Sequence, residues 1–95
     1  MKIIYRLEDS AGNGPFFYRN GQNRIFPDLF FEEDRGLHGF INKNRFKEPS
    51  YIEFYKSSDF YLYKIKISKS LYENKYGEIL FNENDIISKR RIRKW

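Results

Sequence analysis

The feature that most constrains the fold is a strict alternation of side chains in the segment YLYKIKI, residues 61–67. Tyr or Ile occupies every odd position and Leu or Lys every even one, which is the period of a half-buried β-strand. Strand patterns also occur near residues 2–8, 78–82 and 87–93. Together they predict a mainly antiparallel β-sheet of about five or six strands.

A helical pattern precedes the clearest strand. Tyr51, Phe54 and Tyr55 lie at helical spacing, and Pro49 must lie near a helix start or divide two short helices. We therefore predict helix between about residues 43 and 58. The expected fold class is α+β, with one or two helices packed on one face of the sheet.

The alternation near the N-terminus predicts which side chains are buried. We expect Ile3, Tyr5 and Leu7 to face the core, and Arg6 and Glu8 to face solvent. Over the whole chain, the predicted core positions are Tyr5, Phe54, Tyr63, Ile65, Ile79 and Phe81.

Two segments between these strands carry turn signals. Asn20-Gly21 favours a type I′ hairpin, which would place Arg19 and Arg24 on a mostly polar and basic hairpin face. The segment LFFEEDRGLHGF, residues 29–40, is expected to form a loop or a short helical turn.

Composition excludes several classes of protein. The chain has 95 residues, enough for one hydrophobic core but not two, so a single domain over residues 1–95 is expected. It has no cysteine and one histidine, which excludes a disulfide framework and the usual zinc sites, and no metal is expected. Its apolar runs are far shorter than the ~18 residues of a membrane span. Arg6 comes too early for a signal-peptide core, so a cytoplasmic protein without membrane contact is expected.

Positive charge is concentrated at the C-terminus. Five cations fall within six residues, with no acidic residue after Asp85. We call them the C-terminal basic strip: Lys89, Arg90, Arg91, Arg93 and Lys94. The strip, Trp95, Arg19 and Arg24 are the candidate residues for contact with a partner or a nucleic acid, because cations bind phosphates and aromatic rings stack on bases. The net charge of +5 also favours an anionic partner. The alternative is that the charges only keep an edge strand from aggregating.

The motifs YRLED, GNGPF, GLHGF and GEILF, in that order, resemble a family of small phage and prophage proteins over most of the chain. The resemblance implies a non-enzymatic binding protein without cofactor that inhibits a bacterial nucleic-acid-targeting defence complex, as anti-CRISPR proteins do. The implied partner is a bacterial defence protein or ribonucleoprotein, with possible RNA contact. The implied location is the cytoplasm of the bacterial host.

That family is in turn distantly similar to the ADP-ribosyltransferase-like fold. In that fold a strand Arg or His grips the dinucleotide, and a Glu at the start of a late strand stabilises the developing oxocarbenium charge. The matching residues here are Arg6 and Glu78, so the resemblance implies a minimal NAD-dependent transferase as the alternative function. Such enzymes normally carry a Ser-Thr-Ser-like central strand, and in that region this chain has Tyr61-Leu62-Tyr63 without a Ser-x-Ser motif. Convergence of Arg6 and Glu78 in a pocket with an aromatic wall is the feature that distinguishes the two functions.

Overall fold

A computed structural model of the chain describes residues 1–19 and 36–94, which form an antiparallel sheet of six strands. The strand order is β4-β5-β2-β1-β3-β6. The strands are β1 (Lys2–Glu8), β2 (Leu37–Phe40), β3 (Tyr61–Ile67), β4 (Tyr72–Glu73), β5 (Glu78–Phe81) and β6 (Ile86–Ile92). The described helices are α1 (Ile52–Lys56) and the 3-10 helices η2 (Lys43–Lys47) and η3 (Glu83–Asp85). The α+β prediction is confirmed.

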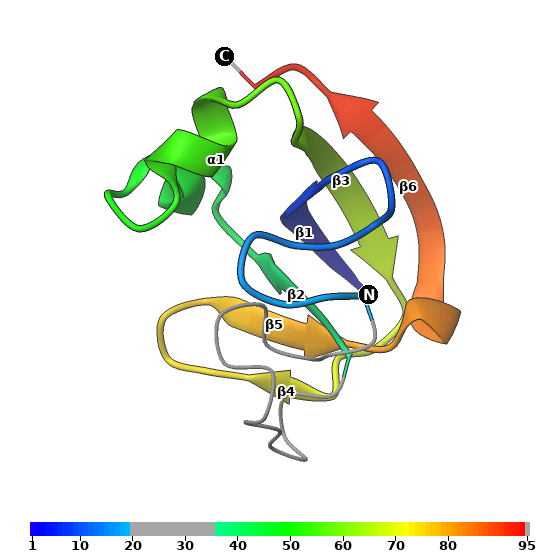
Figure 1. The fold of residues 1–95 in the computed structure, drawn as a ribbon. Helices are drawn as coiled ribbons and strands as arrows, with labels where there is room; N and C mark the ends of the chain where they lie inside the picture. Colours follow the sequence, from blue (N-terminus) through cyan, green and yellow to red (C-terminus); the bar gives the residue numbers. More distant parts are fainter. Residues whose placement is uncertain (20–35, 95) are drawn as a thin grey trace.

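The long strands β1 and β3 form the middle of the sheet. They pair along their whole length, with Ile4 opposite Ile65 and Leu7 opposite Leu62. On the other side of β3, strand β6 forms one edge of the sheet and curves along it, while the short β4 lies at the opposite edge (Figure 1). The basic strip therefore lies on an edge strand and the residues that follow it.

Apolar side chains are buried on both faces of this sheet. One cluster comes from strands alone: Ile4, Leu37, Ile65, Ile67, Ile79 and Phe81. The other lies where η2 and α1 cover the opposite face: Leu7, Phe40, Phe46, Tyr55, Phe60 and Leu62. Of the predicted core positions, Ile65, Ile79 and Phe81 are fully buried. Tyr5, Phe54 and Tyr63 are half-buried and pack against these clusters.

Burial on both faces corrects the prediction for β1, in which Leu7 is buried as expected but Arg6 and Glu8 do not face solvent. Arg6 and Glu8 are each only 3% exposed, whereas Ile3 is 42% exposed. Ile4, Arg6 and Glu8 share one face because successive strand residues point to opposite sides. The prediction was wrong because it assigned the polar residues to solvent, whereas here an ion pair makes their burial tolerable.

The segment from Leu37 to Phe40 was also predicted wrongly. It forms β2, which pairs with β1 on one side and β5 on the other, rather than a loop or a helical turn. A side chain at Gly39 would place a Cβ 2.9 Å from both the Cδ1 of Ile4 and the carbonyl oxygen of Tyr5. Glycine at this position therefore permits the close packing of β2 against β1. Two predicted features lie outside the described residues: the hairpin at Asn20-Gly21, and residues 29–35 of the expected loop.

The helix prediction is confirmed in its divided form, because η2 ends at Lys47 and α1 begins at Ile52, on either side of Pro49. Asn42 caps η2 through a side chain that accepts a hydrogen bond from the amide of Asn44, 2.9 Å away. Within residues 1–19 and 36–94, no helix has the length and apolar character needed to cross a membrane.

Candidate functional site

Arg6 is a buried guanidinium that holds the loop after β1 against the sheet. Its Nε donates to Glu8 Oε1 at 2.9 Å, its Nη1 to the carbonyl oxygen of His38 at 2.7 Å, and its Nη2 to that of Gly12 at 3.3 Å. A Cβ at Gly14 would lie 3.4 Å from Nη2, so the loop backbone packs directly over the guanidinium. The side chain thus links β1, β2 and the loop.

The charge of Arg6 is compensated locally. Burial lowers the pKa of the guanidinium, and the neighbouring Glu8 carboxylate acts in the opposite direction. The second oxygen of Glu8 lies 2.6 Å from Lys89 Nζ. Arg6, Glu8 and Lys89 therefore form an ion network that joins β1 to β6.

Glu78, at the start of β5, pairs with His38 on the neighbouring strand. The Nδ1 of His38 lies 2.9 Å from Glu78 Oε1, and because an ionised carboxylate only accepts, this nitrogen carries the proton. The hydrogen bond from His38 lowers the pKa of Glu78. The ring of Phe17 stacks on the imidazole at 4.6 Å between centroids. The other ring nitrogen, Nε2, is buried and has no hydrogen-bond partner within the described part of the chain.

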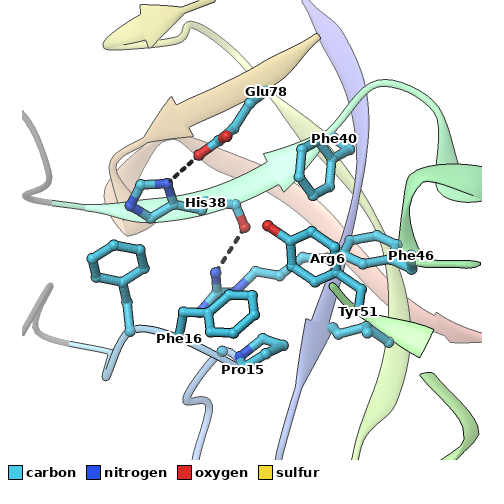
Figure 2. Close-up of a pocket in the computed structure, with 11 residues that line it drawn as sticks. Arg6, Pro15, Phe16, His38, Phe40, Phe46, Tyr51 and Glu78 are labelled. Atoms are coloured by element: carbon cyan, nitrogen blue, oxygen red, sulfur yellow. Dashed lines mark hydrogen bonds and ion pairs between the residues drawn. The ribbon is translucent and has the colours of Figure 1, made fainter. Parts of the chain in front are cut away.

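Arg6 and Glu78 do line one cavity. Figure 2 shows that they approach His38 from two sides, with Glu78 at the imidazole and Arg6 at the backbone carbonyl. The walls of the cavity are aromatic: Phe16, Phe17, Phe40, Phe46 and Tyr51. Burial and the nearby negative charge of Glu78 raise the pKa of Tyr51 to about 12, so its hydroxyl stays protonated at neutral pH.

The size of this cavity limits what it can hold. Its volume is about 40 Å³, whereas pockets for small ligands typically measure about 300–1,000 Å³. The guanidinium of Arg6 is committed to Glu8 and two carbonyl groups, and the residue is 3% exposed. In this conformation the cavity has room for a few water molecules or one small chemical group, and not for a dinucleotide.

The basic strip divides between the two faces of the sheet. Lys89 and Arg91 lie on the same face as Ile65 and Tyr63, their partners on β3. The ammonium of Lys89 is 4.6 Å from the centre of the Tyr63 ring and also binds Glu8. The guanidinium of Arg91 lies 3.9 Å from the centre of the Tyr61 ring. Arg90 points to the opposite face, where its partner on β3 is Lys64.

The remaining candidate residues differ in their surroundings. Arg93 is exposed, whereas Lys94 Nζ donates to the carbonyl oxygen of Ser57 at 2.5 Å, and burial lowers the pKa of this lysine. Arg19 forms an ion pair with Glu83, with Nε and Oε2 3.2 Å apart. Arg24 and Trp95 lie outside the described residues, so the predicted hairpin face that joins Arg19 to Arg24 stays a prediction.

Sequence reasoning missed three residues of these sites. Lys64 and Lys66 lie beside Arg90 in the β3–β6 pair. The alternating pattern of residues 61–67, combined with the register of β6, could have predicted this position. His38 was not predicted to join Arg6 to Glu78, since nothing in the local sequence indicates that contact. Comparison with protein-family models, with curated proteins and with solved structures finds no match for this chain.

Proposed function

We propose that this chain is a small, non-enzymatic binding protein of phage type that inhibits a bacterial nucleic-acid-targeting defence complex. In this proposal it acts in the bacterial cytoplasm and contacts the RNA of a ribonucleoprotein through the edge strand β6. The observation that supports it best is the stack of Arg91 on Tyr61 beside the exposed Arg93.

The chemistry of this pair suits RNA. A guanidinium held over an aromatic ring keeps its planar N–H groups available at the rim, where they can donate to phosphate oxygens. Arg91 is exposed, and within residues 1–19 and 36–94 no carboxylate forms an ion pair with Arg91 or Arg93. Unpaired bases also stack on tyrosine and on arginine planes.

The proposed contact is narrower than the whole basic strip. Lys89 forms an ion pair with Glu8, and Lys94 is bound to the carbonyl group of Ser57. Both side chains are therefore less free to contact a polyanion directly than the sequence suggests. The link to a defence complex rests on the resemblance to phage proteins, and a guide RNA would supply the phosphates.

Paired variants test the RNA contact. Arg91→Ala with Arg93→Ala should lower affinity for single-stranded RNA and flatten the log–log salt dependence by about 1.4, since each lost phosphate contact is worth about 0.7. Lys43→Ala with Lys56→Ala removes the same charge from exposed helix positions and should leave the slope nearly unchanged. Equal losses of RNA affinity in both variants would mean that net charge, and not a specific contact by Arg91 and Arg93, determines the binding.

The partner itself requires a second experiment. The tagged protein should capture a nuclease complex from a lysate of phage-sensitive bacteria, and nuclease activity of that complex should fall when the protein is added. RNase treatment before capture should weaken the interaction. A captured complex that binds equally well after RNase treatment, and to the Arg91 and Arg93 variant, would contradict the RNA-mediated contact.

The alternative function is a minimal NAD-dependent ADP-ribosyltransferase. The observation in its favour is that Arg6 and Glu78 line one aromatic cavity. The small volume and the committed guanidinium weigh against it. We expect neither NAD hydrolysis nor transfer of labelled ADP-ribose to co-incubated proteins. If ADP-ribose transfer is detected and disappears in Glu78→Gln, the transferase function would replace the proposal of a non-enzymatic binding protein.

A further inference from the structure

A second basic feature lies on the face of the sheet opposite Arg91. A hollow of about 130 Å³ at the β3–β6 pair is lined by Ile3, Lys64, Lys66, Ser88, Lys89 and Arg90. The ammonium of Lys89 lies on the other face, beside Tyr63 and Glu8, so the cations that face the hollow are Lys64, Lys66 and Arg90. Lys64 is directly opposite Arg90, and Lys66 is directly opposite Ser88. The helices cover the other end of this face, around Leu7 and Leu62.

Lys64, Lys66 and Arg90 differ from the cations of the protein that form ion pairs. Within the described ranges, Lys2, Arg19, Arg45 and Lys89 each form an ion pair with a glutamate. Over the same residues, no carboxylate forms an ion pair with Lys64, Lys66 or Arg90. Like charges placed directly across two strands destabilise a sheet, so this arrangement costs stability unless an anion is bound.

Protection against aggregation explains only part of the arrangement. A charged edge strand resists pairing with other chains, and Arg90 lies on such a strand. Lys64 and Lys66 lie on β3, which is already paired on both sides with β1 and β6. Their charges therefore protect no free strand edge, whereas a bound anion would balance the charges of all three cations.

We propose that this hollow binds the terminal phosphate monoester of a single-stranded RNA. The proposal rests on the proposed function, because it names the group of the RNA that is recognised. A phosphate monoester carries a charge of about −1.5 to −2 at neutral pH, which matches three cations better than the single charge of an internal diester. The hydroxyl of Ser88 supplies a further donor at the rim.

The surroundings favour RNA over a lipid headgroup. On the other face of β6, Arg91 stacks on Tyr61, a pair suited to bases and phosphates that follow the end of the strand. Ile3 is the one apolar side chain among the residues that line the hollow. A single isoleucine gives little insertion energy into a bilayer.

The test compares three internally labelled RNA 12-mers of one sequence, with a 5′-phosphate, a 3′-phosphate or neither. We expect one terminal phosphate to tighten binding about tenfold, as charge-assisted hydrogen bonds allow. The variant Lys64→Gln/Lys66→Gln/Arg90→Gln should bind the three RNAs equally. The charge-matched control Lys43→Gln/Lys56→Gln/Lys69→Gln should keep the tenfold preference, and inorganic phosphate should compete with the phosphorylated RNA.

The outcomes separate this inference from the proposed function. RNA binding with no preference for a phosphorylated end, or with a preference that survives the triple variant, overturns the inference alone. Absence of all RNA binding overturns both. The Arg91 and Arg93 double variant should bind every RNA more weakly and retain the preference.

Two further measurements complete the test. Vesicles that contain phosphatidic acid present a phosphate monoester on a membrane; binding to them as tight as to the phosphorylated RNA would assign the site to lipid and overturn the inference. If the triple variant does not fold, Lys66→Gln alone should reduce the preference about twofold, since it removes one of three similar contacts that together give tenfold. An unchanged preference in that variant would contradict the inference.

Discussion

Lys89 binds Glu8 across the intervening strand β3, with Nζ and Oε2 2.6 Å apart, although the two residues are 81 positions apart in the chain. The lysine passes over the ring of Tyr63 on the way, 4.6 Å from its centre. This residue of the basic strip is therefore already paired within the protein, with the buried Glu8, and is less available to an external anion.

Lys89→Ala should therefore destabilise the protein. Glu8 would keep Arg6 but lose the partner of its second oxygen, which costs about 1–3 kcal/mol for a buried acceptor. Lys66→Ala is the matched control, because that lysine has no ion pair within residues 1–19 and 36–94 and its loss should change stability by less than about 0.5 kcal/mol. Urea unfolding measures both; equal midpoints would show that the contact with Glu8 contributes nothing.

Arg6→Gln should be among the most damaging substitutions in the chain. It removes the charge that faces the buried Glu8 and the donors to the carbonyl groups of His38 and Gly12, at a cost of roughly 3–5 kcal/mol. The stability of Arg6→Lys should lie between that of the parent and that of Arg6→Gln, since one ammonium keeps the charge but cannot reach all three acceptors. Thermal unfolding gives the order; a lysine variant as stable as the parent would contradict the role of the guanidinium as a three-way link.

The strands that the sequence predicted are the ones with a clear period. Residues 61–67 alternate throughout, and β3 has those bounds. β2 was missed because it is four residues long, contains Gly39 and is buried on both faces, so its backbone conformation is set by pairing with β1 and β5. Alternation in β1 gave the correct period and the burial of Leu7 but missed the second buried face, since the ion pair that buries Arg6 depends on contacts beyond the strand.

The candidate sites show the same division between local and distant information. The density of cations after Asp85 is visible in the sequence, whereas the ion pair of Lys89 depends on Glu8 at the other end of the chain. Only the family resemblance could predict that Arg6 and Glu78 line the same cavity. The cavity between them is narrow because aromatic side chains from the loop, β2, η2 and Tyr51 fill it, and no local pattern indicates that packing.

Phe81→Ala should test the strand-only core cluster. The side chain is fully buried in that cluster, and truncation of a buried phenylalanine costs roughly 3–5 kcal/mol, comparable with the whole stability of a small domain. Tyr76→Ala is the control, because Tyr76 is 62% exposed. Circular dichroism melting should show a large loss for the first variant and a shift of a few degrees at most for the second. Similar melting temperatures for both would contradict the position of Phe81 in the core.

The pair of His38 and Glu78 should make stability depend on acid pH. The hydrogen bond from His38 lowers the pKa of Glu78 below its ordinary value of 4.5, so the folded state holds the carboxylate ionised more strongly than the unfolded state. The contribution is therefore fully present above about pH 4.5 and is lost as the pH falls through the lower, folded pKa.

Glu78→Gln removes this dependence while it keeps an oxygen near His38 Nδ1. At pH 7 the variant should melt below the parent, and the difference should shrink as the pH falls below about 4.5, where the parent also loses its carboxylate charge. Glu53→Gln, on the exposed side of α1, is the control and should follow the parent at every pH. A difference between Glu78→Gln and the parent that stays constant from pH 7 to pH 3 would mean that the charge of Glu78 is not what the hydrogen bond stabilises.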